Sequence, residues 1–142
     1  MRAKKPPRVL IAEDNRETRM VVAAALRRAG YVVTEARDGA TAVDHIGSCL
    51  LHVVPDPPDL VVAAARMPVM NGLQVLASMR PLGVPVILID VLATDHTTRA
   101  LAQRLGAVSV FDKPCDVARL CETVTQLVPI PVSLRESLRE SA

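Results

Sequence analysis

The sequence predicts an α/β protein with a doubly wound parallel sheet, and three observations support this prediction. Short apolar runs alternate with longer stretches whose apolar residues recur at helical spacing, five times in strict order. Strands that are apolar throughout are buried on both faces, as in a parallel sheet covered by helices on each side. Half of the chain is apolar but it holds only one Tyr, one Phe and no Trp, so the core must be aliphatic.

Each element has its own signal. The expected strands are the apolar runs at 9–12, 31–36, 60–63, 84–89 and 107–111. Asn15 can cap a first helix at about 16–29, which Gly30 would end. A second helix is expected at about 39–51, before the prolines of 55–58, and Asn71-Gly72 opens a third that runs to Arg80. Apolar residues at helical spacing predict the last two helices, at about 95–105 and 116–128.

The length of 142 residues predicts one domain. We expect a basic N-terminal tail at 1–7, the domain at 8–128, and a linker or C-terminal tail at 129–142. In that tail the sequence SLRE repeats as Ser133–Glu136 and Ser137–Glu140, and Ser133 with Glu136 fits a helix capping box. The repeat is either the start of a helix leading to a partner or a frayed terminus.

Composition excludes several classes of function. Two aromatic residues cannot form a base-stacking platform, and a net charge of +2 is too small for strong phosphate-backbone binding, so no direct nucleic-acid binding is expected. No apolar run is long enough for a membrane span, and the basic start lacks a signal-peptide core. The odd cysteine count, without ligand spacing, predicts buried or idle thiols in a reducing cytoplasm. The cysteines are Cys49, Cys115 and Cys121.

Polar residues follow the predicted strands, at the edge where a doubly wound sheet forms its sites. Glu13 and Asp14 follow the first strand, Asp90 follows the fourth, and Lys113 follows the fifth, beside Asp112. The third strand ends instead on Ala64. Three carboxylates and one lysine are therefore expected to converge, with Asp112 as a possible fourth carboxylate.

Several motifs in order resemble the receiver domain of bacterial response regulators, the proteins of two-component phosphorelay signalling. They are Val9–Asn15, Gly30–Val33, Asp38-Gly39, Pro58–Val62, Met67–Gly72, Pro85–Ile87, Gly106-Ala107 and Lys113-Pro114. The resemblance covers about 8–128 and implies a flavodoxin-like (βα)5 fold with strand order 2-1-3-4-5. It also implies that a histidine kinase passes a phosphoryl group to an aspartate at the end of the third strand, with Mg²⁺ bound beside it.

Carried over position by position, the resemblance is incomplete. Glu13 and Asp14 match the acid pair that binds the metal, Lys113 matches the lysine that pairs with the phosphoryl group, and Pro114 matches a proline that is usually cis. The acceptor position, counted back from Met67-Pro68, is Ala64, and a methyl group is neither a nucleophile nor a metal ligand. The position of the Thr or Ser that binds the phosphoryl oxygen is Asp90, and that of the aromatic switch is Val110.

These departures predict a degenerate receiver, or pseudo-receiver: a regulatory protein-interaction module, not an enzyme, that does not accept phosphate. The alternative is a conventional receiver whose aspartate at position 64 has been replaced by Ala. We expect a weak or absent Mg²⁺ site and a contact between Asp90 and Lys113 where phosphate would sit. Asp90 as a substitute acceptor is a minor alternative.

The expected partners are a histidine kinase, a phosphotransfer protein or another signalling protein, and no membrane. A homodimer through the surface of the fourth helix, fifth strand and fifth helix is possible, since charges of both signs lie there. They equally suit an ordinary solvated surface. The charged residues of this surface are Asp95, Arg99, Arg104, Arg119 and Glu122.

Overall fold

The computed structural model describes residues 5–51, 56–134 and 136. Its strands are β1 (Arg8–Ala12), β2 (Val32–Ala36), β3 (Leu60–Ala64), β4 (Val86–Val91) and β5 (Ser109–Asp112). Its helices are α1 (Arg16–Arg28), α2 (Gly39–Leu50), α3 (Gly72–Met79), α4 (His96–Arg104) and α5 (Val117–Leu127), and a short 3-10 turn at Arg80–Leu82 follows α3. The five predicted strand–helix units are therefore confirmed, with ends that move by one or two residues.

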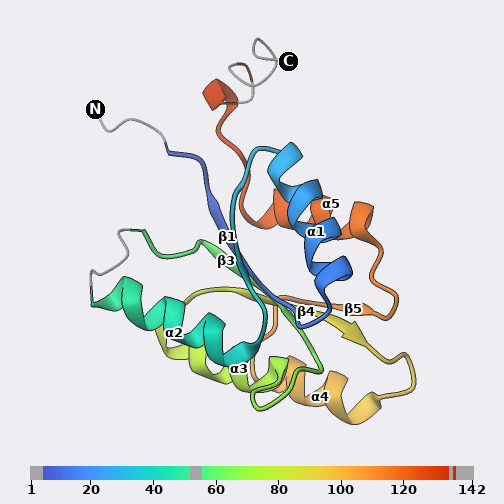
Figure 1. The fold of residues 1–142 in the computed structure, drawn as a ribbon. Helices are drawn as coiled ribbons and strands as arrows, with labels where there is room; N and C mark the ends of the chain where they lie inside the picture. The colour runs from blue at the N-terminus through green and yellow to red at the C-terminus, as the bar shows by residue number, and fades with distance from the viewer. Residues whose placement is uncertain (1–4, 52–55, 135, 137–142) are drawn as a thin grey trace.

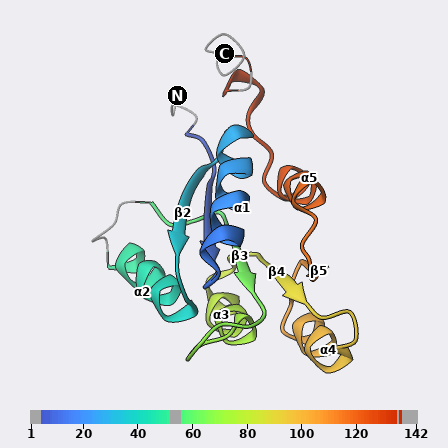
Figure 2. The ribbon, with the colours of Figure 1, turned by 45° about the vertical axis from the view of Figure 1, so that its right-hand side comes forward.

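The strands form one parallel sheet in the order β2-β1-β3-β4-β5, as the family resemblance implied. Helices α1 and α5 cover one face, and α2, α3 and α4 cover the other (Figures 1 and 2). Strand β3 lies in the middle of the sheet, and all five of its residues are buried. Its wholly apolar sequence fits this position, because a central strand has no exposed face.

Each of the helices α1 to α5 begins at an Asn or Asp side chain that accepts a hydrogen bond from a backbone N–H three residues later. These caps are Asn15, Asp38, Asn71, Asp95 and Asp116. In a parallel α/β fold each such helix begins just beyond the carboxyl end of a strand. The caps therefore help to set the loops on the edge of the sheet where the predicted site residues lie.

Packing continues past α5. The Tyr31 hydroxyl donates a hydrogen bond to the Val128 carbonyl oxygen (2.6 Å), Ile130 is buried, and Leu134 packs against the core. The first part of the predicted tail at 129–142 thus lies against the domain. Most of the SLRE repeat lies outside the described residues. No helix in the described ranges is long and apolar enough to cross a membrane.

A pair of glycine substitutions tests the packing of α3 on the sheet. A Cβ at Gly72 would collide with the Ala64 carbonyl oxygen and the Leu88 side chain, whereas a Cβ at Gly47 in α2 meets nothing nearby. Gly72→Ala should lower the free energy of unfolding by roughly 1–3 kcal/mol. Gly47→Ala should raise it by roughly 0.5–1 kcal/mol, because alanine is the better helix residue. Urea denaturation measures both, and equal effects would contradict the close contact at Gly72.

Candidate functional site

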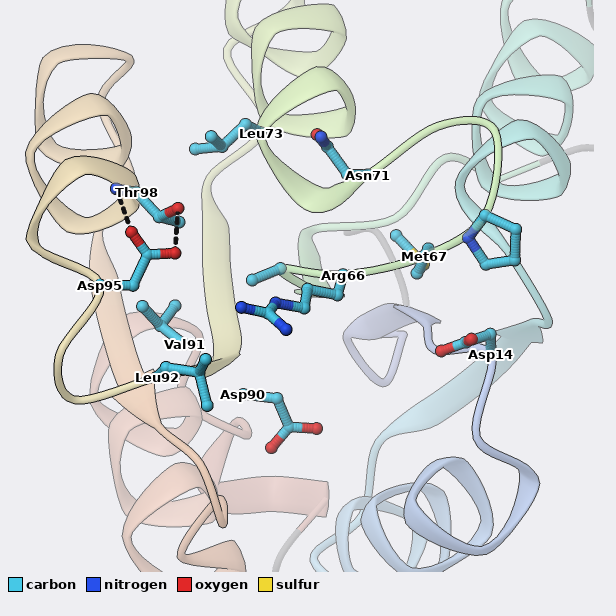
Figure 3. A pocket seen from close by; sticks show the side chains of 12 residues that line it. Asp14, Arg66, Met67, Asn71, Leu73, Asp90, Val91, Leu92, Asp95 and Thr98 are labelled. Carbon is cyan, nitrogen blue, oxygen red and sulfur yellow. Dashed lines mark hydrogen bonds between the residues drawn. The ribbon is translucent and has the colours of Figure 1, made fainter.

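A cleft of about 440 Å³ opens at the carboxyl ends of the strands (Figure 3). It is lined by Asp14, Ala65, Arg66, Met67, Pro68, Asn71, Leu73, Asp90, Val91, Leu92, Asp95 and Thr98. A second hollow of about 320 Å³ lies between α1 and the loop after β5, and it is lined by Glu17, Thr18, Val21, Asp90, Lys113, Pro114, Cys115 and Val117. Asp90 lines both, so its side chain lies where the two hollows meet.

Glu13 is the one buried charged residue among the described residues, with 3% of its surface exposed. Its Oε1 accepts a hydrogen bond from the Asn15 N–H (2.9 Å), but its Oε2 is buried without a hydrogen-bond partner. The pKa of Glu13 is raised to about 7, mainly by burial. A hydrogen bond with Asp14 and the charges of Asp90 and Asp14 contribute to the rise, and the hydrogen bond from the Asn15 N–H opposes it. Glu13 and Asp14, the acid pair after β1, thus lie near enough to the Asp90 carboxylate for its charge to affect Glu13.

Ala64 ends β3 as the sequence places it, buried to 1% exposure and paired in register with Ile89 of β4. Its side chain is a methyl group, so the end of the central strand offers no nucleophile and no ligand. The N-terminus of α3 packs on this point, since Gly72 lies against the Ala64 carbonyl. The chemistry of the cleft therefore depends on side chains from the neighbouring loops.

Asp90 has an unusual backbone. Its φ is +57°, in the left-handed region that few residues other than glycine adopt, and the pairing of β4 with β5 is irregular between Leu88 and Val91. Asp and Asn tolerate this conformation better than β-branched residues do. The end of β4 is thus shaped around an aspartate, not around the Thr or Ser that the resemblance implies.

Lys113 lies on the loop after β5, before a cis peptide bond to Pro114 that the resemblance also implied. Lys113 and Asp90 line the same hollow, but they form no ion pair. The predicted Asp90–Lys113 contact is therefore wrong. Lys113 is exposed, and an ammonium group that stays in water gains little from such a pair.

Two further predicted site residues, Val110 and Asp112, lie on β5. Val110 is half-buried and packs against the core, as does its neighbour Phe111. Asp112, the possible fourth carboxylate, instead forms an ion pair with Arg99 of α4. One charge of the predicted interaction surface is therefore neutralised within the chain.

Sequence reasoning missed Arg66 as a site residue. Arg66 lies two residues after the end of β3, and its side chain projects into the cleft between Asp90 and Asp95 in the view of Figure 3. Residues that directly follow each strand were the expected site residues, and Arg66 lies just beyond that position. Asp95 was expected on the surface of the fourth helix, but it also lines the cleft, where Thr98 donates two hydrogen bonds to it (2.6 and 3.0 Å).

The cysteines are free thiols, as expected. Burial raises the pKa of Cys115 to about 11, with a smaller contribution from Asp90, and burial also raises the pKa of Cys49 and of Cys121. Since the thiolate is the reactive form, all three are poor nucleophiles. The His45 Nε2 lies 3.8 Å from the Cys49 Sγ, and both residues are on α2, which lines neither hollow. His52 lies outside the described residues.

A metal ion would need several oxygen ligands here. In the ranges that the structure describes, no three His, Cys, Asp or Glu side chains are grouped so that they could hold one. Glu13 and Asp14 are close, but the third carboxylate of the region, Asp90, comes from a different strand end. The methyl group of Ala64 adds no ligand between them.

The order of this sheet defines a flavodoxin-like α/β domain with an acidic cleft at its carboxyl edge. The family model of the response regulator receiver domain matches residues 9–125, and the chain belongs to this family. It is 34% identical over 110 residues to the alkaline phosphatase synthesis transcriptional regulatory protein SphR of Synechococcus elongatus, covering 75% of this chain and 43% of SphR. It is 31% identical to the response regulator MprA of Mycolicibacterium vanbaalenii, covering 87% of this chain and 51% of MprA.

The chain therefore spans about half the length of these two relatives. Among solved structures, the response regulator TrrA of Thermotoga maritima, in complex with Mg²⁺ and BeF, has a TM-score of 0.72. Its sequence identity is 22%, and the match covers 86% of this chain and 99% of that one. At this identity the likeness establishes the fold.

The raised pKa of Glu13 predicts a pH-dependent stability. The folded chain keeps the Glu13 proton up to about pH 7, while the unfolded chain loses it near pH 4.5, so the free energy of unfolding falls as pH rises through this window. In the unaltered chain the free energy of unfolding should fall by roughly 2–3 kcal/mol between these two pH values, and Glu13→Gln should abolish this fall. Glu17→Gln, an exposed change of the same charge, is the control, and urea denaturation at a series of pH values measures both. The same slope in both variants would refute the assignment.

The backbone of Asp90 predicts a contrast between two substitutions. Asp90→Thr introduces a β-branched residue at φ +57° and should lower the free energy of unfolding by about 1–2 kcal/mol. Asp90→Asn keeps a residue that accepts this φ and should have a much smaller effect. Chemical denaturation measures the free energy of unfolding of both variants. Equal values for Asp90→Thr and Asp90→Asn would contradict the left-handed backbone at this position.

Proposed function

We propose that this chain is a pseudo-receiver: a receiver domain that does not accept a phosphoryl group and acts as a regulatory protein-interaction module. The observation that carries the proposal is Ala64, which occupies the end of β3 where the family motif calls for an aspartate. Phosphoryl transfer to a receiver needs a carboxylate oxygen that attacks phosphorus, and a methyl group has none.

Two further positions support the same proposal. Asp90 stands where the motif calls for a Thr or Ser that would donate a hydrogen bond to a phosphoryl oxygen, and its carboxylate would repel that oxygen. Val110 stands at the aromatic switch position and offers no ring that could move between two sites. The acceptor, the hydroxyl group and the aromatic ring are all absent, so the parts of the phosphorylation switch are lost together.

We also propose that Mg²⁺ binds weakly here or does not bind. Receiver domains typically hold Mg²⁺ with the acid pair and the acceptor aspartate. In this chain Glu13 and Asp14 would be the remaining ligands, and Ala64 removes the anionic ligand between them. A pKa near 7 leaves Glu13 partly protonated at neutral pH, which weakens it further as a ligand.

Receiver domains interact with histidine kinases and phosphotransfer proteins. We propose that this chain still binds a protein of this signalling class, that it acts in the cytoplasm, and that it has no catalytic activity of its own. A second copy of the chain could bind at the surface of α4, β5 and α5. Leu101 of α4 is exposed on this surface, on the same helix as Arg99 of the Arg99–Asp112 ion pair. Apolar and charged side chains on one surface are the usual make-up of such interfaces.

Incubation with acetyl phosphate and Mg²⁺, followed by intact mass spectrometry, tests the proposal. The unaltered chain should gain no phosphoryl mass, because it lacks the attacking carboxylate. Ala64→Asp restores that carboxylate next to Glu13, Asp14 and Lys113, and it should gain one phosphoryl group in a fraction of the molecules.

Ala64→Asn is the matched control, because it adds the same volume without a nucleophilic oxyanion. A phosphoryl mass on the unaltered chain would overturn the proposal. Its disappearance in Asp90→Asn would then identify Asp90 as a substitute acceptor.

A further inference from the structure

The backbone of Arg66 is held in place at the cleft, although the Arg66 side chain is exposed. Its neighbours Ala65 and Met67 are both buried. The Ala65 N–H donates to the Ile89 carbonyl (2.9 Å), and the Ala65 carbonyl accepts from the Gly72 N–H (3.2 Å). The backbone at Arg66 is thus held between β4 and the start of α3, so its side chain leaves from a fixed point.

The surroundings of the Arg66 guanidinium are acidic. Asp14 lines the cleft from the loop after β1, Asp90 from the end of β4 and Asp95 from the start of α4. Figure 3 shows the guanidinium between the Asp90 and Asp95 side chains, without a direct ion pair to either. Hydrogen bonds from Thr98 hold the pKa of Asp95 below its usual range, and the Arg66 charge lowers it further. Among the described residues that line this cleft, Arg66 alone is basic, since Lys113 lines the second hollow.

Carboxylates gathered at one sheet edge need a counter-charge, because like charges repel strongly where protein displaces water. A guanidinium suits this role, because it is always charged, weakly hydrated and able to approach several oxygens with its five N–H groups. A divalent cation in the same cleft would have to approach the Arg66 charge. The two cations compete for one set of oxygens.

We propose that Arg66 is the built-in cation of this cleft and takes the place of a divalent metal ion. This deepens the proposed function and rests on it in part, because it names what partly neutralises the acidic residues of a receiver that does not use metal-dependent phosphoryl transfer. One positive charge then faces these carboxylates at all times, whatever the metal concentration.

Mn²⁺ titration followed by the electron paramagnetic resonance signal of free Mn²⁺ tests this, at fixed ionic strength. Mn²⁺ is a suitable probe because it takes the same oxygen ligands as Mg²⁺. Arg66→Met keeps the aliphatic stem and removes the charge, so it should raise the Mn²⁺ affinity by about tenfold or more. Arg66→Lys keeps a positive charge and should leave the affinity near that of the unaltered chain.

Arg28→Met changes net charge equally, at the end of α1 away from its acidic start, and should have no effect. As a second measurement, Mg²⁺ should raise the melting temperature of Arg66→Met but not that of the unaltered chain. Equal Mn²⁺ affinity in the unaltered chain and Arg66→Met, or an equal gain in Arg28→Met, would overturn the inference. Mn²⁺ binding involves no phosphoryl transfer, so this result stands apart from the acetyl phosphate experiment.

Discussion

The parallel sheet brings like charges together, and much of the site depends on this constraint. All strands point the same way, so the residues that follow them gather at one edge. Glu13, Asp14 and Asp90 reach that edge from two strands, and the burial of Glu13 makes their repulsion costly. The raised pKa of Glu13 is one result of this crowding, because its burial and the charges of Asp14 and Asp90 all favour its protonated form.

The packing at the end of β3 shows how the fold persists at this edge without an acceptor aspartate. Gly72 at the start of α3 lies against the backbone carbonyl of residue 64, which any residue at that position would supply. The central strand and the helix beside it therefore need nothing from a side chain at position 64. Fold and phosphoryl chemistry can separate in this way because the first depends on buried strands and the second on a few loop residues.

Much of the fold could be predicted from the sequence, and the site only in part. Apolar runs such as Leu60–Ala64 and caps such as Asn15 are local signals, so the elements and their order followed from them. The family motifs supplied the strand order and the positions of Glu13, Asp14 and Lys113. The Asp90–Lys113 contact was wrong and Arg66 was missed, because distances between loops depend on backbone angles and side-chain directions that spacing does not encode.

The sequence by itself determined the class of fold, the family and the absence of a carboxylate at position 64, because each rests on the identity and order of residues. Only the tertiary structure decided which charges meet. It buried Glu13 beside Asp14, set Asp90 between two hollows, paired Asp112 with Arg99 and brought Arg66 into the acidic cleft. The physical reason is that electrostatic energy depends on distance and burial, and both are properties of the folded chain.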